Sequence, residues 1–219
     1  MIYLFVPYYT EDTPEFRQSL ESQIVPFQEI RRNRKADKIC WTKAVNDFRK
    51  ELMRYRGLKD DDVVCIMNND ISFGEKLFEE GSEVALFNGN VYIPEGININ
   101  WKTKSFNKTC IRINVDSFAG RCFFMTVRDF IDSGGFSKLL PHCLSDLDFG
   151  LRMIKKGSDI TIMVNNISHC NHNQEMRPFK IHSQTNPIFW TIFLLKHFNK
   201  YTFLNITKAW VDAWRYRNG

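Results

Sequence analysis

The sequence lacks three patterns that would each assign it to a large class of proteins. It contains no run of about 18 apolar residues, so no transmembrane helix is expected. None of its six cysteines forms a CxxC pair, which argues against a zinc site. No face-length cluster of Lys and Arg accompanies the net charge of +5, which argues against a nucleic-acid partner. The mild positive excess is compatible with phosphate-bearing ligands or an anionic membrane surface.

The chain also lacks a secretory signal pattern. Its first residues, Met1 to Pro7, form a short strand pattern with no basic region and no long apolar core. Cys65 and Cys122 lie inside apolar runs and are expected to be buried, reduced thiols, which indicates a reducing compartment. With 219 residues, no internal repeat and no low-complexity linker, the chain is expected to form one α/β domain in the cytoplasm.

Strand patterns alternate with helical patterns along the chain. The predicted strands are Ile2–Val6 (closed by Pro7-Tyr8-Tyr9), Phe27–Arg31, Val63–Met67, Val84–Phe87, Asn90–Ile93, Phe118–Val127 and Ile160–Val164. The first predicted helix begins at Pro14. The other predicted helices are Lys38–Arg56, Glu75–Glu80, Arg128–Ser133, Asp146–Lys156, Pro187–His197 and Leu204–Arg215. The segment Asn98–Thr109 shows no periodicity and is predicted to be a loop. This alternation predicts a mostly parallel sheet flanked by helices.

One predicted strand, Val63–Met67, runs directly into Asn68, Asn69 and Asp70. A continuous apolar run is typical of a strand buried on both faces, and ligands of open α/β sheets bind beyond the carboxyl ends of such strands. A carboxylate and two amides would then lie where a charged ligand or a metal binds. The alternative is an Asx turn that caps the next helix.

A second acidic group opens the predicted helix at Asp146 and Asp148. Residues two apart do not share a helix face, so Asp146 can point into a cleft while Asp148 serves the first turn. The alternative is simple capping with a favourable helix-dipole interaction. The preceding Gly134-Gly135 pair permits close backbone approach to a ligand or a positive φ.

Two histidines, His169 and His172, follow the last predicted strand. A loop histidine is usually structural or merely exposed. Together with a carboxylate at a strand end, however, such histidines permit a mixed oxygen and nitrogen site of the kind that Mn²⁺ tolerates.

These motifs occur in an order that resembles the family 2 glycosyltransferases of the GT-A fold, especially the compact bacterial rhamnosyl- and galactosyl-type enzymes. The similar segments are Pro7-Tyr8 after the first strand, Trp41-Thr42-Lys43-Ala44-Val45-Asn46, Asn68-Asn69-Asp70 in place of a DxD motif, Phe118-Ala119-Gly120 with Gly134-Gly135-Phe136, and Ser145-Asp146-Leu147-Asp148 with Arg152. The match covers residues 1 to about 175.

The resemblance implies a Rossmann-like GT-A catalytic domain over residues 1–175, with nucleotide-sugar binding in 1–90, the acceptor side in 91–175, and a helical extension over 176–219 packed on the same domain. It implies an inverting transfer of a sugar from a nucleotide-sugar donor to a glycan or lipid-linked glycan acceptor. Asp146 would be the catalytic base, and Asp70 and His169 would bind Mn²⁺ or Mg²⁺. The implied donor-binding residues are Pro7, Tyr8, Tyr9, Lys43, Asn46, Asn68 and Asn69, and the acceptor-side residues are Gly120, Gly134, Gly135, Asp148 and Arg152.

The sequence departs from the family pattern at three places. No acid ends the second strand, in Glu29-Ile30-Arg31-Arg32-Asn33, and Asn68 and Ser145 stand where the family usually has acids. The last two departures leave open a non-catalytic binding module with a degenerate site. A nucleotidyltransferase is a further alternative, although it would normally carry a glycine-rich basic loop where this chain has Pro7-Tyr8-Tyr9-Thr10.

The C-terminal extension is rich in aromatic residues interspersed with Lys and Arg. These aromatic and large apolar residues are Phe189, Trp190, Phe193, Leu194, Phe198, Tyr201, Phe203, Trp210 and Trp214. One interpretation is an amphipathic surface that makes the protein peripheral to the inner face of the membrane. The other is that the aromatic side chains are core and pack against the catalytic domain.

Overall fold

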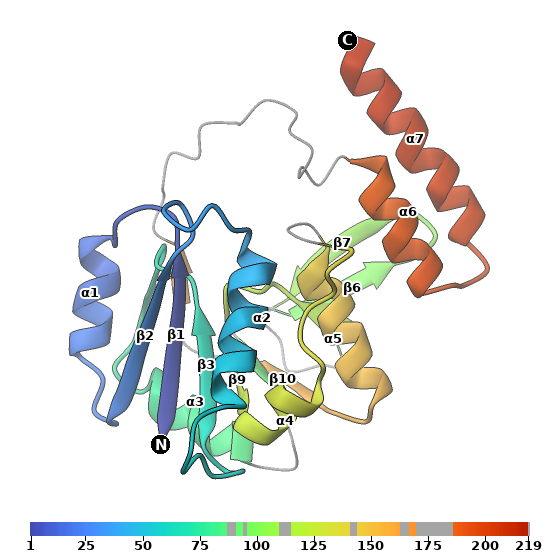
Figure 1. Ribbon diagram of the computed structural model, residues 1–219. Coiled ribbons are helices and arrows are strands. Elements are labelled where there is room, and N and C mark those ends of the chain that lie inside the picture. The colour runs from blue at the N-terminus through green and yellow to red at the C-terminus, as the bar shows by residue number, and fades with distance from the viewer. Residues whose placement is uncertain are drawn as a thin grey trace.

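The computed structural model of the chain (Figure 1) describes residues 1–86, 91–93, 96–109, 115–140, 144–162, 167–169 and 186–218. Its centre is a six-stranded sheet with the strand order β10-β5-β9-β3-β1-β2. The strands are β1 Ile2–Tyr8, β2 Phe27–Asn33, β3 Val63–Met67, β5 Val91–Ile93, β9 Cys122–Thr126 and β10 Ile160–Ile162. All neighbouring strands are parallel except β9, which runs antiparallel to both β3 and β5. The predicted mostly parallel α/β sheet is therefore confirmed.

Helices cover both faces of this sheet (Figure 1). They are α1 Pro14–Glu21, α2 Trp41–Leu52, α3 Leu77–Leu86, α4 Val127–Asp132 and α5 Ser145–Lys155, followed by α6 Pro187–Lys196 and α7 Thr202–Asn218. Side chains of the sheet alternate between two apolar cores, as the two-residue period of a strand requires. In β9, for example, Phe123 packs into the core under α2, α4 and α5, whereas Phe124 packs into the core under α1 and α3.

Two smaller sheets flank the central one. The first pairs β4 Ile71–Phe73 with β11 Ile167–His169, and the second contains β6 Gly96–Asn100, β7 Ser105–Thr109 and β8 Ser117–Phe118. A third apolar core joins the second small sheet to α5 and to α6, through Ile97, Leu147, Phe189 and Phe193. Figure 1 shows α6 and α7 beside β6 and β7, with α7 at the outer edge.

The strand Val63–Met67 has the predicted bounds, and all five of its residues are buried. Several other elements differ from the prediction. The predicted strand Val84–Phe87 is helical as far as Leu86, because Phe78, Gly81 and Ala85 recur at helical spacing and face the sheet, while Phe87 lies outside the described residues.

The predicted loop Asn98–Thr109 is the β6–β7 hairpin, in which Ile97 and Ile99 alternate with asparagines and point into the third core. The first strand also continues through Pro7 and Tyr8 instead of ending at Val6, because both residues pair with β2. The strands β4 and β11 are absent from the prediction.

Candidate active site

The polar residues after β3 lie at the carboxyl edge of the central sheet, close to the loop that follows β1. The Asn69 amide donates to the carbonyl of Thr10 at 2.9 Å and to a carboxylate oxygen of Asp12 at 3.0 Å. Asp70 Oδ1 is buried and has no hydrogen-bond partner. Because an unpartnered buried carboxylate oxygen is costly, this atom fits the position of a cation ligand.

His169, the second predicted metal ligand, lies on a strand whose backbone pairs beside Asp70. Strand β11 runs antiparallel to β4 and places His169 opposite Ile71, the residue that follows Asp70. Within the described ranges, no three His, Cys, Asp or Glu side chains cluster closely enough to hold a metal ion by themselves. His172 lies outside those ranges. Asp70 and the His169 backbone are thus neighbours, and metal binding by the pair stays a prediction.

Trp41 connects the end of β3 with the start of α5. Its indole N–H donates to Asn68 Oδ1 at 3.0 Å, and its ring lies against Gly120. The Gly120 N–H in turn donates to Asp146 Oδ2 at 3.0 Å. A Cβ atom on Gly120 would lie 3.1 Å from Asp146 Cβ and 3.2 Å from the Trp41 ring, so the close approach favours glycine here. Asn68, Trp41, Gly120 and Asp146 therefore form one continuous line of contacts.

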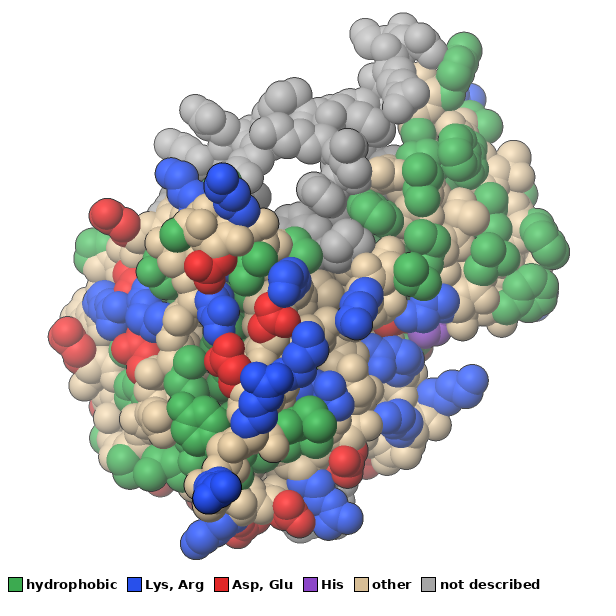
Figure 2. All heavy atoms as spheres, in the orientation of Figure 1, with side chains coloured by type: hydrophobic (Ala, Val, Ile, Leu, Met, Phe, Trp, Pro, Cys, Tyr) green, Lys and Arg blue, Asp and Glu red, His purple; other side chains and the backbone are tan. Residues whose placement is uncertain are grey.

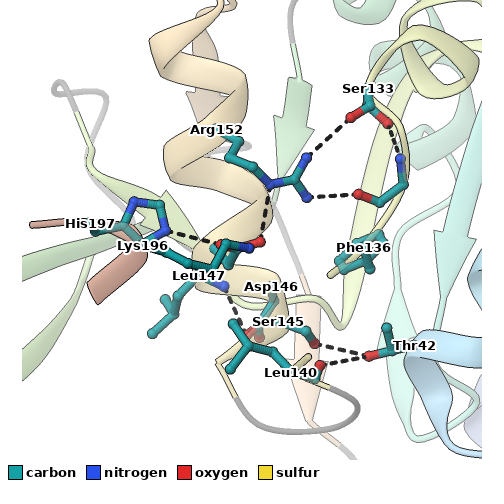
Figure 3. Close-up of polar contacts among 12 residues, drawn as sticks. Thr42, Ser133, Phe136, Leu140, Ser145, Asp146, Leu147, Arg152, Lys196 and His197 are labelled. Carbon is teal, nitrogen blue, oxygen red and sulfur yellow. Dashed lines mark hydrogen bonds and ion pairs between the residues drawn. The ribbon is translucent and has the colours of Figure 1, made fainter. Parts of the chain in front are cut away.

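Asp146 occupies the first turn of α5, and backbone donors fix its carboxylate. Besides the Gly120 bond, Asp146 Oδ1 accepts the Leu147 N–H at 2.9 Å (Figure 3). Burial raises the pKa of Asp146, and the hydrogen bonds from Gly120 and Leu147 only partly offset that effect. A carboxylate with a raised pKa accepts a proton more readily, which suits a general base.

The residue before α5 adopts an uncommon backbone conformation. Leu144 is the N-cap of the helix and has φ +62°, in the left-handed region where bulky residues are rare. The next residue, Ser145, is buried, and its hydroxyl lies 3.2 Å from the Thr42 hydroxyl, which also lies 3.3 Å from the Leu140 carbonyl. These contacts, labelled in Figure 3, hold the start of α5 against α2.

The glycine pair after α4 is held by side chains that were predicted to bind ligands. Gly134 and Gly135 have φ +76° and +77°, which favours glycine at both positions. The Asn46 amide donates to the Phe136 carbonyl at 2.9 Å and accepts the Phe136 N–H at 2.8 Å. Arg152 donates to the Gly135 carbonyl at 2.7 Å. Their polar groups are therefore engaged in fixing this turn, and ligand binding by any of them stays a prediction.

Asp148 is fully buried and connects α5 to the end of α6. Its carboxylate accepts from Arg152 Nε at 3.0 Å, pairs with Lys196 Nζ at 2.6 Å and lies 3.1 Å from His197 Nε2. Burial raises the pKa of Asp148, but the contacts with His197, Lys196 and Arg152 outweigh it and bring the pKa to about 2. With three protein partners, the carboxylate has a structural role, and its predicted contact with the acceptor stays a prediction.

The predicted donor-binding residues at the end of β1 lie beside basic side chains. The Arg31 guanidinium lies 4.7 Å from the centre of the Tyr8 ring, and that of Arg34 lies 5.7 Å from the centre of Tyr9. The Pro7 carbonyl accepts from Arg34 Nε at 3.1 Å. The last of the group, Lys43, is exposed and pairs with Asp47 one helical turn away at 2.6 Å. The contacts place Pro7 to Tyr9 at the edge that carries Asn69, whereas Lys43 faces solvent on α2.

Asp12 is an organising residue that the sequence analysis missed. It is nearly buried and pairs with Arg17, with Arg31 at 2.8 Å and with Asn69. Burial raises its pKa, but hydrogen bonds from Arg31 and Asn69 outweigh this and lower the pKa overall. Its position in the loop after β1, at the same sheet edge as Asp70, is the signal that could have found it. The neighbouring residue Thr13 is the N-cap of α1, and its side chain accepts the Phe16 N–H.

Comparisons with known proteins concern the fold. No family model and no curated protein sequence matches this chain. Among solved structures, GalNAc-T7 crystallised with UDP, GalNAc and Mn²⁺ is similar over 91% of this chain, with a TM-score of 0.67 and 8% identity. S. aureus TarS (residues 1–349) in complex with UDP-GlcNAc is similar over 89%, with a TM-score of 0.55 and 10% identity. The chain covers 48% of the first protein and 66% of the second. The central sheet and its helices are thus the GT-A fold of these two glycosyltransferases.

Proposed function

We propose that the chain is a glycosyltransferase that transfers a sugar from a nucleotide-sugar donor to a hydroxyl group of a glycan or lipid-linked glycan. The observation that carries the proposal is the line of contacts from Asn68 through Trp41 and Gly120 to Asp146. The line begins two residues before Asp70, whose buried Oδ1 has no hydrogen-bond partner, and it ends at Asp146, whose pKa is raised by burial. A donor-side acid and a separate base at one edge of a GT-A sheet are what sugar transfer requires.

Asp70 is the residue that fits a divalent ion on the donor side. Its buried Oδ1 lacks a partner, and a hard ion such as Mg²⁺ or Mn²⁺ prefers oxygen ligands. The similar GalNAc-T7 structure contains UDP and Mn²⁺, which supports this assignment. His169 would supply a further ligand, and the donor diphosphate would supply the rest. When bound, such an ion neutralises negative charge on the leaving diphosphate.

Asp146 would accept the proton of the acceptor hydroxyl as that hydroxyl attacks the sugar. The N–H groups of Gly120 and Leu147 take one site on each carboxylate oxygen, which fixes the carboxylate and leaves further acceptor capacity. General base catalysis of this kind contributes about 10²–10⁴-fold to the rate. Attack from the face opposite the nucleotide would invert the anomeric centre.

The test is a comparison of Asp146→Asn and Asp70→Ala with the unmodified chain, after a screen of UDP-, GDP- and dTDP-sugars for nucleotide release. Asp146→Asn should lower transfer by about 10²–10⁴-fold while calorimetry shows unchanged donor binding. Asp70→Ala should abolish Mn²⁺-dependent donor binding. Asp60→Asn is the matched control, because this carboxyl is exposed and belongs to no part of the proposed site. It should change neither the rate of transfer nor the binding of the donor. Full activity of the Asp146→Asn chain would refute the base assignment.

A non-catalytic sugar-nucleotide binding module is the second candidate. It is favoured by Asn68 and Ser145, which replace acids of the family pattern and are engaged with Trp41 and Thr42. A binding module would bind donor without releasing nucleotide over hours in the presence of any acceptor. The same nucleotide-release screen therefore separates the two candidates.

A further inference from the structure

The C-terminal helices expose large apolar side chains on one continuous surface, which we call the aromatic face. Its members, each more than half exposed, are Ile188 and Leu195 of α6, Phe198 of the connection, and Phe203, Leu204, Trp210 and Trp214 of α7. Figure 2 shows apolar side chains gathered over this part of the molecule. Three other aromatic residues of the extension, Phe189, Trp190 and Phe193, are buried in the core that it shares with β6. The extension thus has both a core side and an exposed apolar side.

Helix α7 has two sides of different composition. Its buried residues, Thr202, Asn205, Ala209 and Ala213, recur at spacings of three and four and lie on one side of the helix. Phe203, Trp210 and Trp214 follow the same spacing but are offset, so they project from the other side. The aromatic face is therefore a consequence of the register in which α7 lies on the domain.

Contacts between the helices make the exposed residues of α6 and α7 one surface. The Trp210 indole N–H donates to the Thr191 hydroxyl on α6 at 3.2 Å. The rings of Phe198 and Phe203 meet edge to face with their centres 5.7 Å apart. A single flat partner could therefore touch both helices at once.

The extension also carries most of the net charge. Residues 186–219 contain five basic residues (Lys196, Lys200, Lys208, Arg215 and Arg217) and one acid, Asp212, so they account for +4 of the +5 of the chain. Asp212 is neutralised by Lys104 of the β6–β7 hairpin at 3.0 Å, and Lys196 is paired with Asp148 of α5, so the remaining positive charge comes from Lys200, Lys208, Arg215 and Arg217. An exposed apolar surface with this excess of positive charge is complementary to an anionic, partly apolar partner.

We propose that the aromatic face docks on a lipid bilayer that contains anionic lipids. Exposed Trp and Phe side chains bind at the boundary between headgroups and acyl chains, while nearby Lys and Arg are attracted to anionic headgroups. No helix in the described part of the chain is long and apolar enough to cross a bilayer. Asp148 clamps the end of α6 to α5, so docking would hold Asp146 at a fixed height above the lipid.

The experiment is sedimentation of the full chain with vesicles of phosphatidylcholine alone and with about one third phosphatidylglycerol. We expect binding to the anionic vesicles that weakens with salt. Phe203→Ser with Trp214→Ser should lower the association constant at least about tenfold. Lys200→Gln with Arg215→Gln should lower it about fivefold per charge, on anionic vesicles only. An unchanged thermal unfolding midpoint would show that these exposed substitutions leave the fold intact.

The matched control is Ile24→Ser with Met53→Ser. These two side chains are 62% and 57% exposed, close to the 69% and 66% of Phe203 and Trp214, but lie outside the extension. The control should bind vesicles like the unmodified chain. Three results would overturn the proposal: no binding to either vesicle, equal loss in the control, or a dimer in light scattering that the Phe203 and Trp214 substitutions dissociate. Donor binding by calorimetry is independent of all three, so failure here leaves the proposed reaction standing.

Discussion

The carboxylate of Asp148 is expected to be the most pH-sensitive link between α5 and the C-terminal helix α6. It is fully buried and lies within hydrogen-bond distance of Arg152, Lys196 and His197. The perturbation we consider is Asp148→Asn, which keeps the volume of the side chain and removes its charge. The substitution leaves two cations at the α5–α6 contact without their counter-ion.

The magnitude of the stabilisation follows from the pKa of Asp148, which is about 2 in the folded chain and 3.8 in the unfolded chain. Because the folded value is depressed, ionisation stabilises the fold above the unfolded pKa, by about 2 kcal/mol at pH 7. The stabilisation decreases to about 1 kcal/mol at pH 3 and is lost as the pH falls through the folded value.

The assay is urea unfolding of the unmodified chain and of the D148N chain at several pH values between 7 and 3. The free energy of unfolding of the D148N chain should be lower by about 2–4 kcal/mol at pH 7, and the difference should shrink by about 1 kcal/mol at pH 3. Asp212→Asn is the control, because its pair with Lys104 is half exposed and such pairs contribute about 0–1 kcal/mol. A D148N difference that stays constant across the pH range would show that packing, not charge, is responsible.

Three further predictions concern the site. Gly135→Ala should cost about 2–4 kcal/mol in urea unfolding, because its φ is +77° and the added Cβ would overlap the Asn46 side chain, whereas Gly57→Ala, at φ +96° with open space around it, should cost only about 1 kcal/mol. Trp41→Phe removes the indole N–H that holds the Asn68 amide at the end of β3, and it should lower kcat/KM about tenfold with little change in the free energy of unfolding. A loss of kcat/KM that is matched by an equivalent loss of unfolding free energy would contradict a positioning role. Because burial raises the pKa of Asp146, the acidic limb of the kcat/KM profile should lie above the usual range of an aspartate, with activity rising as pH increases, and a limb at or below that range would refute the assignment.

The parts of the fold that the sequence predicted are those determined by local patterns. Strand β3 is a run of five apolar residues between polar flanks, and it is buried on both faces as such runs usually are. The β6–β7 hairpin was missed because its strands read Gly-Ile-Asn-Ile-Asn and Ser-Phe-Asn-Lys-Thr, in which asparagine obscures the alternation. Strand β11 pairs with β4 about a hundred residues earlier, and no local pattern encodes such a pairing.

The same distinction applies to the site. Asp70 and Asp146 could be predicted as site residues because each follows or opens an element whose local pattern is clear. The role of Trp41 depends on a bond to a residue 27 positions away, and that of Asn46 on bonds to a residue 90 positions away. A single sequence carries no signal for such pairs, so the hydrogen bonds by which Asn46 holds the turn at Phe136 were not predicted, and its binding of the donor stays a prediction.

Helix α5 brings these arguments together because its first turn serves two purposes. Asp146 and Asp148 are two residues apart and lie on different sides of the helix, as the helical period requires. One carboxylate has a raised pKa and contacts Gly120; the other has a lowered pKa and contacts α6. Neutralising the first should therefore change the rate of transfer and neutralising the second should change stability and the hold on the extension. The opposite assignment of those two effects would be incompatible with the geometry of this turn.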